Sequence, residues 1–526
     1  MYRDAIKFQP RYRISGLLTV QTALHVGDGL AVAGRLPSTP AVKVNTFCVN
    51  HAGTAFIPGS TIKGVLFAWL QASGLSNAQS KVVFGEVDAN KEPISGGKAE
   101  FRDAVLTRLS PPQPNTDQNP DGQRRNWNAR RGTCVEPRVA IDPRTKTADD
   151  QKLFQIEYVP DGSKFHVSVE LPMASDEELL LLLRAFEAFN EAVNPLRIGS
   201  DQANHWGSVH WGLTGVETID VAAVAQWITQ PIIGQLPFKP HPARVDTLRQ
   251  QARTTFPGTN ATTRLRINVT LQFSGPFLVN DPSQARFAAD GEFSIGHSSL
   301  LRQDGSRFYL PSSSLRGAFR GQAARIWRTI AQQSNVGPEN EQKSEAKTRD
   351  DLQRLQGFYR LFGAPGWRAP IEITDFEITS ASRHDQEFIA IDRFTGGGAH
   401  RKKFSARARH RPTATGTISI DLARLRNVCA DNWHWAVMVM LFALRDLREG
   451  DITFGFGAGK GYGHCSAIFD PQPCGDAEVD AVLQTFAANQ PLAQHAPVLD
   501  AWYADLLGYV SQAALTDHIP VQQRGT

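Results

Sequence analysis

Alternating apolar and polar positions mark two distant stretches of the chain, residues 14–28 (ISGLLTVQTALHVGD) and residues 267–281 (INVTLQFSGPFLVND). Alternation is the period of a strand with one buried face, so each stretch predicts a half-buried strand. Each stretch then runs into a turn and ends on an aspartate. The stretches begin at residues 14 and 267, an offset of 253, which indicates that one unit occurs twice.

A second pair of segments repeats at the same offset. IPGSTIKGVLFAWL begins at Ile57 and LPSSSLRGAFRGQA begins at Leu310, again 253 positions apart. In both, a turn rich in serine or threonine leads into a helical pattern, and such residues suit an N-cap, where the hydroxyl accepts a backbone N–H. Further pairs follow at shifted offsets, as insertions require: residues 98–107 with 370–379, 139–142 with 389–392, and 198–209 with 454–465.

This duplication predicts the domain boundaries. We expect a first module over residues 10–225, a proline-containing linker over 226–262, a second module over 263–475, and a helical extension with a polar tail over 476–526. An apolar pattern predicts a second helix in each module. In the first module a capping box of Ser175 and Glu178 precedes it, and in the second module it spans Asp431–Leu447. The order strand, long loop, helix, strand, strand, helix, strand predicts an α+β fold. It is that of two tandem ferredoxin-like, split βαβ units, which RNA-recognition domains also use.

Composition narrows the class of protein. Of 526 residues, 41% are hydrophobic and 21% are charged, which fits a globular chain and excludes a wholly disordered one. No apolar run approaches the length of about 18 residues that spans a membrane, and the N-terminus lacks the apolar region of a signal peptide. Five scattered cysteines without a C-x-x-C pair favour a reducing cytoplasm over a disulfide framework or structural zinc. The net charge is only +4, so a site for a polyanion must come from local clusters.

The serine-led helix starts are the first candidate site. Ser60 and Lys63 in the first module, and Ser313 and Arg316 in the second, combine N–H groups at a helix N-terminus with a cation one turn further on. This combination suits a phosphate of RNA. The alternative is an ordinary N-cap with a solvated cation, but recurrence in both modules favours the phosphate.

A glycine-rich loop over residues 455–463 is the second candidate. Glycines let backbone N–H groups approach a phosphate, and Lys460 beside Gly459 adds charge. The loop is not a Walker A loop, because no G-K-[ST] follows at the required spacing. The alternative is a tight turn between core strands. The matching segment of the first module, residues 198–209, has lost most of these glycines, so we expect it to pack against protein or to hold RNA less closely.

Two further segments combine cations with aromatic residues, and each has a solvated loop or hairpin as its alternative. In residues 393–404, an aromatic tip could wedge between bases while cations hold the strand. In residues 111–132, an insertion rich in proline, asparagine and arginine, the arginines could stack on bases. The candidate RNA-binding cations are Arg393, Lys402 and Lys403 in the first segment, and Arg124 and Arg125 in the second.

These motifs together resemble the CRISPR-associated RAMP superfamily. IPGSTIKG and LPSSSLRG are similar to its P-G-S-S-[LI]-[KR]-G signature, and FGFGAGKGYGH to its C-terminal glycine-rich loop. AIDRFTGGGAHRKKFS is similar to the I-D-R-x-T-G-x-A stretch of type III backbone subunits, and LHVGDG to their L-H-I-G start. The chain most resembles a double backbone subunit of a type III (III-D-like) effector, with two RAMP units fused. The resemblance implies a guide-RNA-binding subunit that kinks the guide–target duplex with a thumb-like hairpin and cleaves target RNA with a loop aspartate.

The resemblance also implies that the catalytic aspartate lies between the first strand and the P-G-S-S helix. Near the expected place this chain has Ser38 in the first module and His297 in the second, so the pattern is imperfect. The candidates are the nearby carboxylates, with Asp28 ranked first, then Asp290 and Asp281. Cleavage by the target's own 2′-OH needs an in-line phosphate, and a carboxylate can accept the proton or help to hold Mg²⁺ or Mn²⁺. No tightly bound cofactor is expected, and the alternative is that these aspartates only cap turns.

Two other functions stay open. A subunit that binds RNA without chemistry fits the missing loop aspartate in both modules. A guide-processing endoribonuclease also pairs two ferredoxin-like units, but it relies on a histidine-centred site and lacks the P-G-S-S starts, so the sequence favours it less. Asp103 and Asp375, in matched strand pairs, and His25 are interpreted as structural. The expected partners are guide RNA, target RNA and other type III effector subunits, with no membrane and a cytoplasmic location.

Overall fold

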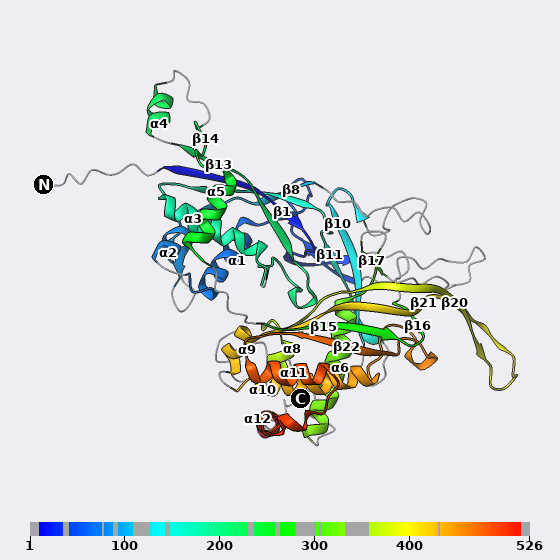
Figure 1. Ribbon diagram of the computed structural model, residues 1–526. Coiled ribbons are helices and arrows are strands. Elements are labelled where there is room, and N and C mark those ends of the chain that lie inside the picture. The colour runs from blue at the N-terminus through cyan, green and yellow to red at the C-terminus, as the bar shows by residue number, and fades with distance from the viewer. Residues whose placement is uncertain are drawn as a thin grey trace, which may run out of the picture.

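The computed structural model describes residues 10–34, 42–75, 78–87, 93–108, 127–141, 148–192, 194–219, 221–229, 236–257, 264–279, 301–303, 307–331, 357–364, 366–429 and 432–516. These residues form two modules that lie one above the other in Figure 1, each with an antiparallel sheet and helices against it. The mixture of helices and separate open sheets is that of the expected α+β class. No helix among these residues is long and apolar enough to cross a membrane.

The first module is built on a seven-stranded sheet with the order β14-β13-β1-β12-β8-β4, in which β7 also pairs with β12. The strands are β1 (Arg11–Val20), β4 (Phe56–Ile57), β7 (Glu100–Phe101), β8 (Ala104–Arg108), β12 (Lys164–Leu171), β13 (Val209–Ile219) and β14 (Lys239–Pro240). Strand β1 buries every second side chain, as its alternating sequence predicts, because only one face of the sheet meets the helices. It lies between β13 and β12, and this order is that of a split βαβ unit.

The second module repeats this arrangement in an eight-stranded sheet with the order β17-β18-β20-β21-β15-β22. Its strands are β15 (Arg264–Phe273), β16 (Pro276–Phe277), β17 (Leu301–Gln303), β18 (Arg307–Leu310), β19 (Ile371–Ile373), β20 (Phe376–Ile391), β21 (Gly398–Asp421) and β22 (Cys465–Gln472). Strand β15 lies between β22 and β21, as β1 lies between β13 and β12. The predicted pair of split βαβ units is therefore present.

Helices cover one face of each sheet. In the first module these are α1 (Gly59–Ala72), α2 (Ala78–Phe84) and α3 (Asp176–Glu187), and in the second α6 (Ser312–Ala331), α8 (Gly357–Phe362), α9 (Leu422–Cys429) and α10 (His434–Glu449). The predicted capping box is present at α3, where the hydroxyl of Ser175 accepts from the N–H of Glu178 at 3.2 Å and the carboxylate accepts in return. Each module has its own core, with Phe186 stacked on Trp211 in the first and Trp327 edge-on to Trp435 in the second.

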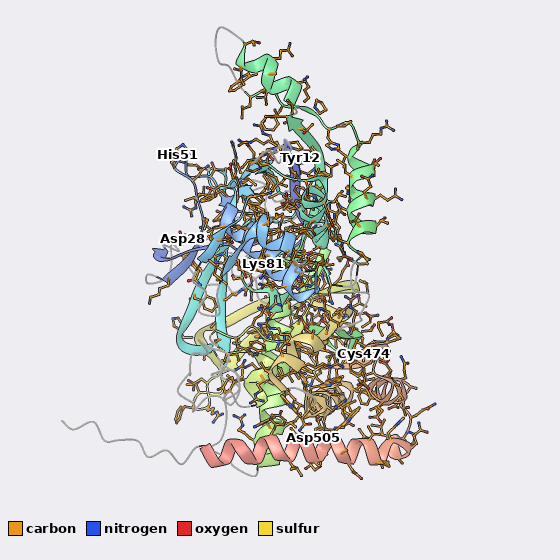
Figure 2. The ribbon with its side chains drawn as sticks, turned by 90° about the vertical axis from the view of Figure 1, so that its left-hand side faces the viewer. Tyr12, Asp28, His51, Lys81, Cys474 and Asp505 are labelled. Atoms are coloured by element: carbon orange, nitrogen blue, oxygen red, sulfur yellow. The ribbon has the colours of Figure 1, made fainter. Side chains whose placement is uncertain are left out.

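The stretch expected to be a linker, residues 226–262, contains the end of α4 (Val221–Ile228) and all of α5 (Val245–Thr255). Helix α5 packs on α3 of the first module, where the guanidinium groups of Arg249 and Arg253 donate to the buried carboxylate of Glu187 at 2.7 and 2.5 Å. At the other end of the chain, α11 (Ala477–Ala487) packs on β22 and α12 (Ala496–Thr516) packs on α10. Figure 2 shows α12 along one edge of the second module.

Two structures extend beyond the central sheets. The first is a five-stranded sheet of β2 (Gly27–Gly34), β3 (Val42–Phe47), β9 (Trp127–Asn128), β10 (Thr133–Ile141) and β11 (Ala148–Tyr158), with the small pair β5 (Gly85–Val87) and β6 (Pro93–Gly96) apart from it. The second is the hairpin of β20 and β21, whose end reaches away from the rest of the molecule in Figure 1.

The loop before the last strand has the same geometry in both modules. Gly199 and Gly455 both have positive φ, +85° and +78°. A Cβ on either would lie 2.2 or 2.3 Å from a carbonyl oxygen, that of His25 or of Leu278. His25 and Leu278 are 253 positions apart, so equivalent residues meet in both modules. This repeated close approach confirms the duplication and explains why a glycine stands at both positions.

Candidate nucleic-acid interface

The glycine-rich loop of the second module lies against the base of the long hairpin. The Nζ of Lys460 lies 5.0 Å from the ring centre of Phe388 on β20 and 4.8 Å from that of Phe456. The buried Tyr462 donates from its hydroxyl to the side chain of Gln386 at 2.7 Å. The loop thus lies beside β20 at Phe388, which pairs across the hairpin with Phe404, the last residue of the segment 393–404.

The tip of the hairpin is exposed and apolar. Phe394 is 100% exposed, and Ile389 and Ile391 are 57% and 60% exposed. Asp392 shapes the turn, because its carboxylate accepts the backbone N–H groups of Thr395 and Phe394, and these bonds lower its pKa. An aromatic ring is therefore held out in solvent on an ordered turn, as an element that inserts between bases requires.

The hairpin also concentrates positive charge. Between Ser382 and Arg411 the sequence has eight arginines and lysines against three acidic residues, an excess larger than the net charge of the whole chain. Arg393 is exposed at the tip. Lys402 and Lys403 lie on β21, and their side chains are outside the described residues. This local cluster is the kind of polyanion site that the weak overall charge requires.

The serine-led helix starts are not capped by hydroxyl groups as expected. The N-cap of α1 is Pro58, which makes no side-chain bond, and the carboxylate of Asp103 accepts from the N–H of Gly59 at 2.9 Å. At α6, the carboxylate of Asp375 accepts from the N–H of Ser312 at 2.7 Å. The expectation of serine and threonine caps was therefore wrong, because an aspartate from a strand pair reaches each helix N-terminus first. The structural interpretation of both aspartates is confirmed.

The candidate phosphate ligands at these helix starts have different surroundings. Ser60 is exposed and Lys63 is half-buried beside it. In the second module, Ser313 and Arg316 are half-buried, and Arg316 donates to the carbonyl oxygen of Phe362 at 2.8 Å. The helix start of the first module is thus the more open of the two.

The glycine-poor loop of the first module packs against protein, one of the two outcomes expected for it. The hydroxyl of Ser312, at the start of α6, donates to the carbonyl oxygen of Asn204 at 2.9 Å. Asp201 in the same loop lies 2.5 Å from the guanidinium of Arg138 on β10. The short 3₁₀ helices η2 (Gln202–Asn204) and η4 (Ala458–Lys460) occupy matched positions. The loop that contacts the second module in the first module is therefore exposed in the second.

A buried ion network joins the modules beside this loop. The carboxylate of Glu372 on β19 accepts from Arg264 at 2.5 Å and lies 3.2 Å from Arg197 of the first module. Burial alone would raise the pKa of Glu372, but the two guanidinium groups outweigh it and hold the pKa at about 2. Burial and the charge of Arg197 lower the pKa of the neighbouring His205 to about 4.

Asp28 is the one catalytic candidate among the described residues. It is exposed at the start of β2, at the outer edge of the first module in Figure 2, and both of its carboxylate oxygens accept from the hydroxyl of Thr46, at 2.8 and 2.9 Å. His25 is only 7% exposed, with Nδ1 at 2.6 Å from the carbonyl oxygen of Glu157, which confirms its packing role. Asp281, Asp290, Arg124 and Arg125 lie outside the described residues.

The metal prediction finds no ligand cluster in the part of the chain that the structure describes. No group of three or more His, Cys, Asp or Glu side chains there could hold a metal ion.

Sequence reasoning did not anticipate the residues that anchor the loop to the hairpin. Gln386 and Phe388 lie in no motif, and only the alternation along β20 could have suggested them; Phe456 lies within the glycine-rich motif, but it was not singled out there. The junction contacts of Glu372 and Arg138 were missed for a similar reason, since their partners are distant in sequence.

Comparison with known proteins gives one family match. The model of the family described as the RAMP superfamily matches residues 17–210 and 191–466, two regions that overlap at 191–210 and together cover most of the chain. No curated protein matches the sequence. Among solved structures, a chain of the type III-B Cmr-beta complex in its apo state is 15% identical with a TM-score of 0.29, over 38% of this chain and 97% of that chain. A chain of the type III-B Cmr-beta complex bound to cognate target RNA is 16% identical with a TM-score of 0.27, over 38% of this chain and 96% of that one. Likeness at this level carries no argument about function.

Proposed function

The chain belongs to the RAMP superfamily, and from that premise we propose that it is a guide-RNA-binding backbone subunit of a type III CRISPR ribonucleoprotein. The observation that carries the proposal is the hairpin of β20 and β21, with an exposed aromatic ring at its tip and an excess of basic residues along it. A strand of RNA offers both phosphates for the cations and bases for the ring.

We infer that the hairpin tip kinks the guide–target duplex. Phe394 is the wedge, since its ring is fully exposed and the turn beneath it is fixed by Asp392. Stacking of one base on an aromatic side chain contributes about 1–3 kcal/mol. Lys460 lies beside Phe388 of the hairpin and adds a cation for the phosphates of the same RNA strand.

The junction between the modules supports stacking with further subunits. The first module's loop, residues 199–207, packs on the start of α6. The matching helix start in the first module and the matching loop in the second module are both exposed. The exposed Ser60 and Asp103 mark the open helix start, and the exposed Lys460 marks the open loop. We therefore propose that neighbouring effector subunits contact the chain at these two ends, in the head-to-tail manner of its own modules.

For target cleavage we propose Asp28 as the proton acceptor in the first module. The 2′-oxygen of the target bonds to the adjacent phosphorus as its proton passes to Asp28, and the bond from that phosphorus to the 5′-oxygen of the next nucleotide breaks. That oxygen takes a proton from water, the products are a 2′,3′-cyclic phosphate and a 5′-hydroxyl end, and the kink supplies the in-line geometry. Asp281 and Asp290 stay candidates for the second module.

A subunit without chemistry is the second candidate function. It is favoured by the engagement of both Asp28 oxygens with Thr46, as in an aspartate that only shapes a turn. Guide processing by a histidine-centred site is less favoured, because His25 is buried and bonded to backbone.

The test uses the assembled complex with guide and labelled target RNA. Phe394→Ala should weaken guide binding by roughly tenfold while leaving stability unchanged, because the ring touches solvent only. Asp28→Asn should remove one cut from the product ladder with RNA binding intact. Equal guide affinity of Phe394→Ala and wild type would refute the RNA-binding role of the hairpin, and an unchanged ladder would leave Asp28 as a structural residue.

A further inference from the structure

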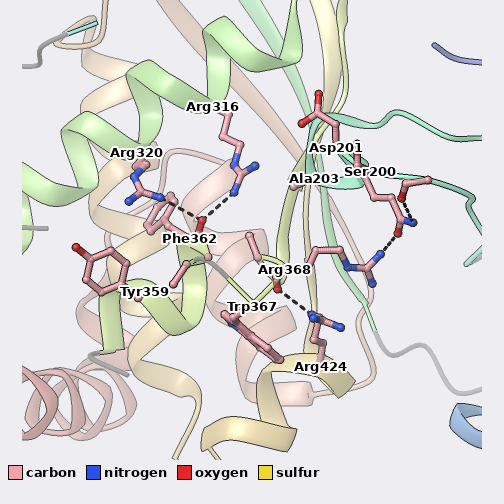
Figure 3. Close-up of a pocket in the computed structure, with 15 residues that line it drawn as sticks. Ser200, Asp201, Ala203, Arg316, Arg320, Tyr359, Phe362, Trp367, Arg368 and Arg424 are labelled. Carbon is pink, nitrogen blue, oxygen red and sulfur yellow. Dashed lines mark hydrogen bonds between the residues drawn. The ribbon is translucent and has the colours of Figure 1, made fainter. Parts of the chain in front are cut away.

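A cavity of about 820 Å³ between the two modules belongs to their junction (Figure 3). It is lined by arginines of the second module, of which Arg316 donates to the carbonyl oxygen of Phe362 at 2.8 Å. Arg424 donates to the carbonyl oxygen of Arg368 at 2.9 Å. The carboxylates that offset the charge of these arginines are Asp201, Glu372 and Asp421. The groups of the cavity are therefore engaged within the junction.

A pair of histidines on the long hairpin is a separate feature, which the proposed site does not use. His384 on β20 and His410 on β21 have stacked rings, with the ring centres 5.5 Å apart and an angle of 29° between the planes. Both side chains are half-buried. His384 pairs with Ala408 and His410 pairs with Ser382, so both imidazoles lie on the same face of the hairpin.

This face is the one that the glycine-rich loop covers. Side chains alternate between the two faces of a strand, so His384 shares its face with Gln386 and Phe388. Gln386 accepts from the hydroxyl of Tyr462 at 2.7 Å, and the Nζ of Lys460 lies 5.0 Å from the ring centre of Phe388. The histidine pair and the loop therefore meet at one surface.

The other side of the loop lies next to His410. The backbone of His410 pairs with Pro276 of β16, and the carbonyl oxygen of Pro276 accepts the N–H of Gly463 at 2.9 Å. The glycines of the loop and Lys460 suit a phosphate. A phosphodiester that the loop holds therefore lies beside the two imidazoles.

The fold does not use the polar atoms of this pair. The Nδ1 of His410 is buried without a hydrogen-bond partner, and His384 makes no hydrogen bond within the part of the chain that the structure describes. Histidines that do serve the fold have a fixed partner, since the Nδ1 atoms of His25 and His205 lie 2.6 and 2.9 Å from theirs. A structural role therefore accounts for those two histidines but not for the pair.

The buried nitrogen decides where neutral His410 carries its proton. A buried N–H without an acceptor costs free energy, so the proton stays on Nε2, and His410 can donate a hydrogen bond from that atom. No buried nitrogen constrains His384 in this way, so its imidazole can accept a proton. A proton acceptor beside a hydrogen-bond donor is the combination that attack by the 2′-OH of RNA requires.

The first module has no such pair. At the offset of 250 that relates the two hairpins, His384 corresponds to Cys134 and His410 corresponds to Pro160. The strand registers agree with this offset, because the residues that pair with Cys134 and with His384 are themselves 250 positions apart. The pair is therefore specific to the second module, and the repeated RNA-binding features do not explain it.

We propose that His384 and His410 form an endoribonuclease site of the second module for the RNA strand that the hairpin holds, an inference that rests on the proposed binding of RNA. His384 takes the proton of a 2′-OH as the 2′-oxygen bonds to the adjacent phosphorus, and the bond from that phosphorus to the 5′-oxygen of the next nucleotide breaks. That oxygen takes a proton from water, and His384 returns its proton to the solvent. The Nε2–H of His410 donates to a non-bridging oxygen of the phosphate, where negative charge develops. The products are a 2′,3′-cyclic phosphate and a 5′-hydroxyl end.

The experiment uses the assembled complex of full-length chain, guide RNA and target RNA, with different labels on the guide and the target. His384→Gln removes the proton acceptor, His410→Leu removes the donor, and His410→Gln keeps a donor near the place of Nε2. His400→Gln is the matched control, since His400 lies on β21 of the same hairpin but is exposed near the tip. Thermal melting and guide affinity are measured for each variant, and a second set of RNAs carries 2′-deoxy nucleotides at the cuts.

One cut of the wild type should leave a 2′,3′-cyclic phosphate and disappear with the 2′-deoxy strand. His384→Gln should slow this cut at least about a hundredfold, and His410→Leu should slow it more than His410→Gln does. The control should cut like the wild type, and the label shows whether the strand is guide or target. A wild type without such a cut, or an equal rate in His384→Gln and the control, would overturn the proposal. If guide affinity stays at the wild-type level in that case, the RNA-binding function stands and only the histidine site fails.

Discussion

Glu372 provides the sharpest test of how the two modules are held together. It is 4% exposed and its carboxylate is shared by Arg264 of its own module and Arg197 of the other. Glu372→Gln keeps the shape of the side chain but removes the carboxylate that Arg197 faces and leaves Arg264 with Asp421, at 3.7 Å, as its counter-charge. We expect this change to destabilise the junction.

The magnitude follows from the pKa of Glu372. Its pKa falls from 4.5 to about 2 on folding. Each unit corresponds to about 1.4 kcal/mol, so the shift amounts to roughly 3 kcal/mol of stability at pH 7. Because the folded pKa is depressed, this contribution is complete above pH 4.5 and is lost as the pH falls towards 2. Removing one partner of a buried pair costs about 3–5 kcal/mol in general, in agreement with this figure.

The assay is urea denaturation of the full-length chain, read by tryptophan fluorescence at pH 7 and again at pH 3.5. Glu449→Gln is the control, since Glu449 is exposed at the end of α10. At pH 7 the midpoint of Glu372→Gln should lie roughly 1 M urea below that of the control, and the difference should narrow by about two-fifths at pH 3.5. A midpoint within error of the control at pH 7 would show that the network does not stabilise the junction. A difference that widens at pH 3.5 would show that the pKa of Glu372 is not depressed.

Three further predictions address the loops and helix starts. Gly463→Ala should cost more than about 2 kcal/mol, since a Cβ would lie 1.9 Å from the carbonyl oxygen of Phe454 at a φ of +75°, and a lowered melting temperature with weakened RNA binding would show it. His205 is neutral when folded, with its pKa lowered from 6.5 to about 4, so the chain should lose stability as the pH falls from 6.5 towards 4. His205→Asn, which tolerates the positive φ of 62°, should flatten that slope in denaturation measured across this range. Asp375→Ala should reduce the free energy of unfolding by about 1 kcal/mol or more beyond the loss that Asp103→Ala causes, and thermal melting would show it. The reason is that Asp375 caps a helix start covered by the first module, whereas Asp103 is exposed.

The sequence was sufficient where local pattern and repetition agree. Alternation predicted β1 and β15, and the capping box at Ser175 predicted the start of α3. The matched Gly199 and Gly455 predicted equivalent loops, because each has a backbone position that only glycine fits without strain.

The sequence was insufficient where a contact joins distant residues. The hydroxyl caps were expected from local composition, yet Asp103 is 44 positions from its partner at the start of α1, and Asp375 is 63 positions from its partner at α6. No periodicity records such a pairing. The arginine-lined cavity could not be predicted from the sequence either, because it forms only where a loop near residue 200 meets a helix near residue 424.

The two copies of the glycine-rich loop show how the modules came to differ. Gly457 and Gly461 adopt left-handed conformations beside Lys460, and the first module holds Asp201 and His205 in the same conformations. A residue other than glycine in this conformation costs on the order of 1 kcal/mol, so contacts elsewhere must offset the strain. Asp201 gains its ion pair with Arg138, and the loop gains the hydrogen bond from α6. The first loop therefore became the joint between modules, while the second kept the glycines and the lysine that a phosphate backbone can approach.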